Sequence, residues 1–167
     1  MNIRLYQLER PLKVFLSAFV IILSIGILTG LVYLNQTTNY SPKKAIERFN
    51  GSQQNLKDDV VDIADNYPKP VSEMLITTHN HIIGFSLIFL CIGVIFYFNS
   101  IISGFWKLFL MIEPLVSTVI TFGSIWGMRY IDNKFSYLAG LSSLLIYLSF
   151  FTMSAIILFE LYFKKEK

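Results

Sequence analysis

The pattern of apolar and polar positions divides the chain into four long apolar runs separated by shorter polar segments. The runs cover residues 12–34, 77–98, 105–129 and 135–163. Each is long enough to cross a bilayer core, which takes roughly 20 residues of α-helix. In lipid each run must be helical, because its backbone amides find no water to bond. The sequence therefore predicts an all-α integral membrane protein: one four-helix transmembrane bundle over residues 1–167.

The first run also has the basic flank of a secretory signal sequence, with Arg4, Arg10 and Lys13 before it. Its apolar part is longer than the roughly 7–15 residues of a signal core. Its end, residues 30–35, offers no pair of small residues for cleavage. We expect this run to remain in the protein as a helix.

The one sizeable segment outside the membrane is a predicted outer loop of about 40 residues, 35–75. Ser41 and Pro42 predict the start of a short helix, since serine caps helices and proline is tolerated in their first turn. Asn50 and Gly51 predict its end. An acidic stretch follows over residues 58–65, and Pro70 is expected in the first turn of the second membrane helix.

Composition agrees with a membrane protein. Hydrophobic residues make up 54% of the chain and charged residues 15%, whereas soluble domains carry about 25% charged residues. No basic stripe with interleaved aromatics is present, which argues against nucleic acid as a partner. The one cysteine, Cys91, lies in an apolar run, where we expect a packed thiol.

Charge predicts the orientation of the bundle. Seven basic residues fall on the side that holds both termini: Arg4, Arg10, Lys13, Lys107, Lys164, Lys165 and Lys167. In the long loop on the other side, the charges of the acidic and basic residues nearly cancel. Because positive charge favours the cytoplasmic side, we expect cytoplasmic termini in a multi-pass protein of the plasma or inner membrane. The start of the second helix then faces outward.

The only two histidines, His79 and His81, lie at that outer start of the second helix. At 100° per residue, Glu73, Thr77 and His81 share a stripe, while His79 lies about 200° away from His81. One ion can therefore bind both imidazoles only if the helix is broken there. The candidate metal ligands are His79, His81 and Glu73. The alternative is a polar turn whose imidazoles bond to neighbouring carbonyls or hydroxyls.

Polar residues also form stripes inside the bundle. The third helix has a polar seam of Glu113, Ser117, Thr121 and Ser124 that ends near Arg129, and the fourth has Ser136, Gly140, Ser143, Tyr147 and Ser154. Such stripes indicate close helix packing with hydroxyls bonded across helices, or a path for protons or for the head of a quinone or haem. Pro114 follows Glu113. Because proline has no backbone N–H, the carbonyl of Leu110 loses the helical hydrogen bond that it would otherwise accept.

Two further features of the helices carry expectations of their own. Glu160 lies near the end of the last helix, where we expect its side chain to reach toward water. Gly26 and Gly30 form a small-residue face on the first helix, for which we expect a role in packing.

The run from His79 to Phe85, H-N-H-I-I-G-F, resembles the H-x-H-φ-φ-G-[FW] helix start of small four-helix bacterial membrane proteins. Those in turn resemble part of subunit I of the haem–copper oxidases and the related haem–copper membrane proteins of nitric-oxide response. The likeness covers residues 71–98. It implies that His79 or His81 ligates a haem. The chain lacks a third histidine as second axial ligand and lacks the active-site histidines of the oxidases.

The alternatives for that second ligand are Met128, Met153 or a residue of another subunit. The sequence pattern can also persist in a protein that binds no haem.

Three functions follow as hypotheses. The first is a subunit that binds haem b, copper or zinc and serves electron transport in a respiratory complex. The second is a cofactor-free partner or assembly protein, and the third is a proton or solute pathway along the third helix. Other membrane subunits or a homo-oligomer are the expected partners, and whether the protein is an enzyme stays open.

Overall fold

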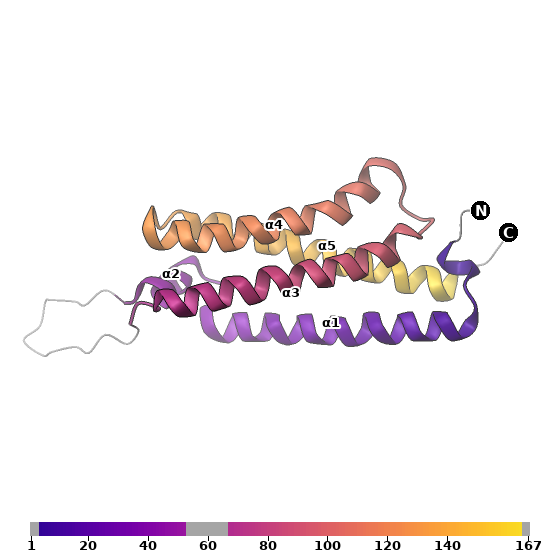
Figure 1. The fold of residues 1–167 in the computed structure, drawn as a ribbon, viewed down its shortest axis with the longest axis horizontal. Coiled ribbons are helices and arrows are strands. Elements are labelled where there is room, and N and C mark those ends of the chain that lie inside the picture. The colour runs from indigo at the N-terminus through magenta and orange to yellow at the C-terminus, as the bar shows by residue number, and fades with distance from the viewer. Residues whose placement is uncertain (1–3, 53–66, 165–167) are drawn as a thin grey trace, which may run out of the picture.

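The computed structural model describes residues 4–52 and 67–164. Four long antiparallel helices make up the body: α1 (Arg10–Thr38), α3 (Val71–Tyr97), α4 (Gly104–Tyr130) and α5 (Phe135–Phe163). A short 3₁₀ turn, η1 (Leu5–Gln7), precedes α1, and a short helix, α2 (Pro42–Asn50), follows it. The start of α1 and the end of α5 lie at one end of the bundle, here called the terminal end (Figure 1). The other, where α2 lies, is called the loop end.

The predicted spans and the short helix are confirmed, with changes at some boundaries. The bounds of α5 coincide with the predicted run, whereas α1 continues to Thr38 and α3 begins as early as Val71. Hydropathy marks only the apolar part of a helix, and a helix continues past it until something stops it. Asn39, in the left-handed conformation at φ 50°, ends α1. The short helix ends at Gly51, whose φ is 84°.

Pro70 precedes α3 as its capping residue and is not in its first turn, which corrects the prediction. The carbonyl of Pro70 already accepts the first helical hydrogen bond, from Met74 N at 3.1 Å. The predicted acidic stretch at residues 58–65 lies outside the described residues.

Helix α5 is the centre of the bundle. The apolar core joins its residues Ile146, Phe150, Met153 and Ile157 to residues of α1, α3 and η1, including Val20, Phe89, Ile92, Phe96 and Leu5. Helix α4 packs chiefly against α5. Most of its buried residues are small, with Ser117, Thr118, Thr121, Ser124 and Gly127 among them. Small residues let two helices approach closely in lipid, where the hydrophobic effect does not drive association.

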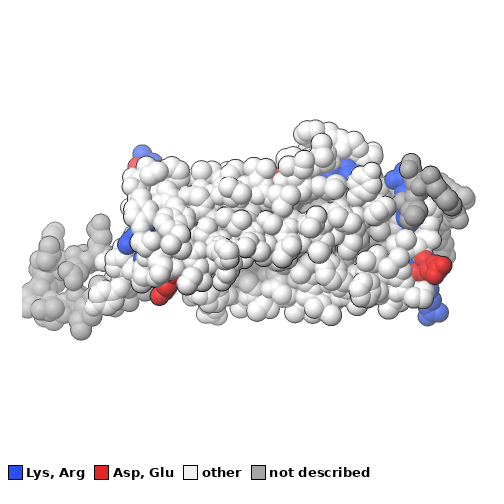
Figure 2. Space-filling view, viewed as in Figure 1, with Lys and Arg blue, Asp and Glu red and all other residues white. Residues whose placement is uncertain are grey.

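The outer surface is apolar along most of its length. On the face in Figure 2, charged side chains lie mostly toward the two ends, with a wide uncharged region between them. All four long helices are long and apolar enough to span a membrane.

Two predictions about residues in the apolar runs concern this outer surface. Cys91 is exposed on it, so the prediction of a packed thiol is wrong. Gly26 and Gly30 also face outward, with no other part of the chain within 4 Å of a Cβ built there. They therefore make no packing contact within the described part of the chain.

Candidate functional site

The histidine pair lies on an unbroken helical turn. Helix α3 runs from Val71 to Tyr97 without interruption, so His79 and His81 point in different directions, as their spacing predicts. Both side chains are exposed in the isolated chain. The two imidazoles therefore do not converge on one ion.

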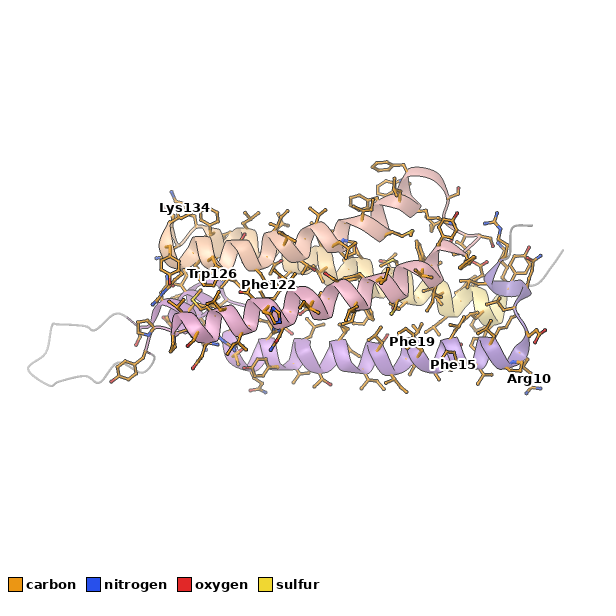
Figure 3. All side chains as sticks on the ribbon, in the orientation of Figure 1. Arg10, Phe15, Phe19, Phe122, Trp126 and Lys134 are labelled. Atoms are coloured by element: carbon orange, nitrogen blue, oxygen red, sulfur yellow. The ribbon has the colours of Figure 1, made fainter. Side chains whose placement is uncertain are left out.

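His81 is oriented by its own helix and by α4. Its Nδ1 lies 2.8 Å from the carbonyl oxygen of Thr77, one turn earlier. Its ring centroid is 5.1 Å from that of Phe122 on α4 and 6.1 Å from that of Phe85. Phe122 lies on the stretch of α4 that passes α3 (Figure 3). The imidazole thus sits beside aromatic rings at the α3–α4 contact.

Trp126, one turn from Phe122, fixes this contact. Its indole Nε1 donates a hydrogen bond to Thr78 Oγ1 at 2.9 Å. The bond ties α4 to the turn of α3 that carries the histidines, so the position of His81 relative to α4 is set by tertiary structure. Sequence reasoning missed Trp126 and Phe122, although both lie on one face of α4 at helical spacing.

Metal chelation by several side chains of one chain finds no support in this arrangement. Glu73 is exposed, as is His79. Over residues 4–52 and 67–164, no three His, Cys, Asp or Glu side chains are grouped closely enough to hold a metal ion. Met128 and Met153 are buried, at 3% and 0% exposure, whereas His81 is exposed. Each exposed imidazole is therefore a separate outward ligand, without a second ligand from these methionines.

The polar seam of α4 forms the contact with α5. Both oxygens of Glu113 accept hydrogen bonds, Oε1 from the hydroxyl of Ser117 and Oε2 from Ser149 Oγ on α5 at 2.6 Å. Thr121 Oγ1 lies 2.7 Å from Ser142 Oγ, also on α5. Ser124 is buried in the same row. Glu113 and Thr121 therefore bond across to α5, as the packing alternative named above expects, whereas the Ser117 hydroxyl bonds within α4.

On α5 the residues that meet this seam differ from those expected. Ser142 and Ser149 face α4, whereas Ser143, in the predicted stripe, bonds to the carbonyl of Gly140 in its own helix at 2.8 Å. Ser136 and Ser154 of that stripe are buried. A stripe chosen by spacing alone can be displaced by one residue, because several faces of α5 carry serines.

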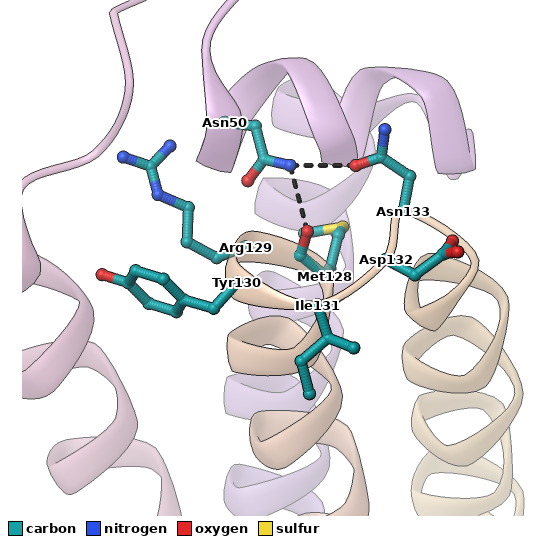
Figure 4. A pocket seen from close by; sticks show the side chains of 7 residues that line it. All are labelled: Asn50, Met128, Arg129, Tyr130, Ile131, Asp132 and Asn133. Carbon is teal, nitrogen blue, oxygen red and sulfur yellow. Dashed lines mark hydrogen bonds between the residues drawn. The ribbon is translucent and has the colours of Figure 1, made fainter.

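Arg129 lies apart from the seam, in a pocket at the loop end. Its Nη1 donates to the carbonyl of Phe49 at 2.9 Å, and Asn50 Nδ2 donates to Asn133 Oδ1 at 3.0 Å. A further bond joins Asn50 Nδ2 to the carbonyl of Met128 at 3.1 Å. Figure 4 shows these side chains around the pocket. The arrangement fastens the end of α2 to the α4–α5 turn.

Glu160 was expected to reach toward water, and the structure corrects this. The residue is fully buried, and its carboxylate accepts from Ser100 N at 2.7 Å and from Ser100 Oγ at 2.6 Å. Lys164 Nζ also bonds Ser100 Oγ, at 2.7 Å. The α3–α4 connection folds over the end of α5 and encloses the carboxylate, which a reading of α5 alone cannot reveal.

Basic side chains hold the same connection from the outside. Lys107 Nζ donates to the carbonyls of Tyr97 and Asn99, at 2.9 and 2.7 Å. Arg4 Nη1 reaches Asn99 O at 3.3 Å. Cations stabilise the carbonyl end of a helix, so basic residues that predicted orientation also cap α3.

Comparison with known proteins gives one result. A protein family described as Aq_1264_TM, a transmembrane helical domain, matches residues 39–167 of the 167-residue chain. No curated protein and no solved structure matches the chain. The matched region holds α2 to α5, with both histidines and the polar seam. By this match over most of its length, the chain belongs to the Aq_1264_TM family of transmembrane helical domains.

Proposed function

We propose that the protein is a membrane subunit that binds a haem or a transition metal through His81, as an accessory to a redox complex. One observation carries the proposal: His81 Nδ1 lies 2.8 Å from the carbonyl oxygen of Thr77. A carbonyl can only accept, so Nδ1 carries the proton. In a neutral imidazole the other nitrogen, Nε2, then holds the free lone pair that a metal needs.

Such a bond is the usual support for a metal-ligating histidine, since it fixes both the tautomer and the orientation of the ring. The rings of Phe85 and Phe122 beside His81 supply flat apolar surface of the kind that suits a porphyrin. When bound, such a group would supply one-electron chemistry. The role of the chain would be to hold its ligand nitrogen at a fixed depth and angle.

The proposal includes a second chain. The buried thioethers of Met128 and Met153 do not face outward with His81, so a further axial ligand would come from another subunit or from a second copy.

We also propose an orientation in the membrane, with both termini in the cytoplasm and His81 toward the outer side. Counted by sequence, the segments at each end hold seven Lys and Arg, but the terminal end has three acids and the loop end seven.

The test is an absorption spectrum of the protein purified from cells supplied with haem precursor, oxidised and then reduced, with metal analysis by mass spectrometry. We expect a Soret band, or a bound metal, that is lost in His81→Ala and kept in His79→Gln. The second variant is the matched control, because His79 has no hydrogen bond within the described part of the chain. A colourless, metal-free wild type, or equal loss in both variants, would reject the assignment.

A cofactor-free assembly role is the second candidate. The bond from His81 to Thr77 favours it as well, because it already satisfies one polar atom of the ring. This role predicts co-purification with a larger membrane complex, and it predicts that His81→Gln leaves that association unchanged. A wild type that carries a metal and loses its partner in His81→Gln would contradict it.

A further inference from the structure

A groove opens on the outer surface between the first half of α4 and α5, at Glu113. Its volume is about 400 Å³, within the roughly 300–1,000 Å³ typical of small-molecule pockets. Its walls are nearly all apolar, formed by Phe105, Leu108, Phe109, Ile112, Val116 and Leu145. Glu113 and Ser117 are the polar residues that line it.

Glu113 lies deep in the membrane span. It is nine residues beyond the start of α4, about 13 Å along the helix axis. Its oxygens accept from two serine hydroxyls, and among the described residues no Lys, Arg or His nitrogen pairs with it. A carboxyl group at such depth is stable when it is protonated or when a cation lies beside it.

In the described part of the chain, the carboxyl of Glu113 is the one acidic group in the lining of the groove, and it favours a ligand that carries positive charge. The apolar walls favour a ligand whose remaining surface is hydrophobic.

We propose that this groove binds a hydrophobic monocation, with its charged centre at the carboxylate of Glu113 and its apolar body against α4 and α5. The site is separate from the histidines, and the proposal does not rest on the function proposed above. The serines hold both oxygens of Glu113 in position, so the carboxylate is oriented before the ligand arrives.

The test uses tetraphenylphosphonium as the probe and equilibrium dialysis of the protein in lipid nanodiscs, with empty nanodiscs subtracted. We expect saturable binding to the wild type, and affinity at least about tenfold lower in Glu113→Gln, equal to about 1.4 kcal/mol. Glutamine keeps an oxygen that accepts from a serine, so the fold should survive, which the melting temperature checks. Tetraphenylborate, an anion of the same shape, should not bind saturably.

A matched pair of variants tests the position of the site. Val116→Trp fills the groove and should abolish binding, whereas Val119→Trp places the same bulk on α4 outside the groove. These two valines are similarly exposed, at 51% and 59%. The proposal is overturned by binding no higher than that of empty nanodiscs, by equal binding in Glu113→Gln, or by equal effects of the two tryptophans.

Discussion

The carboxyl group of Glu160 is enclosed by a segment distant in sequence, the connection between α3 and α4. Both of its oxygens accept from Ser100, one from the backbone N–H and one from the hydroxyl. Asn99, also fully buried, shapes this connection, because its Oδ1 accepts from the backbone N of Ile101 and Ile102. A single residue at the end of α5 thus holds the turn between two other helices.

Replacing this residue should destabilise the protein. In Glu160→Gln the single amide oxygen can accept from only one of the two Ser100 donors. The other donor loses its charged acceptor, and a hydrogen bond to a charged group contributes about 1.5–3 kcal/mol. The measurement is the free energy of unfolding in mixed micelles, followed by tryptophan fluorescence. Glu9→Gln is the control: Glu9 is exposed, and exposed substitutions usually stay within about 0.5 kcal/mol. Equal stability of the two variants would contradict the role of Glu160.

At the scale of helices, the α4–α5 pair is held by small residues and by a short turn. The carbonyl of Gly127 accepts from Ile131 N at 2.8 Å and from Asp132 N at 3.1 Å, which ends α4. The chain then turns back so that Phe135 packs over Gly127. A Cβ at Gly127 would lie 2.7 Å from Phe135 Cδ1 and 2.8 Å from its Cγ.

A methyl group at Gly127 should therefore force the ring of Phe135 aside. We expect Gly127→Ala to lower the free energy of unfolding by about 1–3 kcal/mol, the usual cost of overpacking. Gly123→Ala, one turn earlier, has open space and should be neutral or stabilising by up to about 1 kcal/mol. Adding Phe135→Leu should recover part of the loss in Gly127→Ala. If Gly123→Ala proved the more damaging change, the packing described here would be wrong.

At the scale of the whole molecule, four spans return the chain to the end where it began. The basic residues divide equally between the two ends by sequence, so the proposed orientation depends on the acids, which gather at the loop end. The positive-inside rule counts Lys and Arg and gives acids little influence. Orientation is for this reason a property to measure directly.

Labelling of single cysteines by a membrane-impermeant maleimide measures it, in a Cys91→Ser background. We expect Asp132→Cys, at the loop end, to react in intact cells, and Glu9→Cys, at the terminal end, to react only after permeabilisation. Both positions are exposed, so access differs only by side. The reversed pattern would overturn the orientation, and labelling of both in intact cells would overturn the topology of four spans.

The sequence by itself determined the four membrane helices, because a bilayer demands about 20 apolar residues and an internally bonded backbone. It also determined the divergence of His79 and His81, which follows from helical geometry. Tertiary structure alone decided which serines of α5 meet the seam, that Glu160 is enclosed, and that Phe122 and Trp126 lie beside the histidine turn. Periodicity along one helix fixes a face, but only packing selects its partner, because in lipid most faces of a helix are equally apolar.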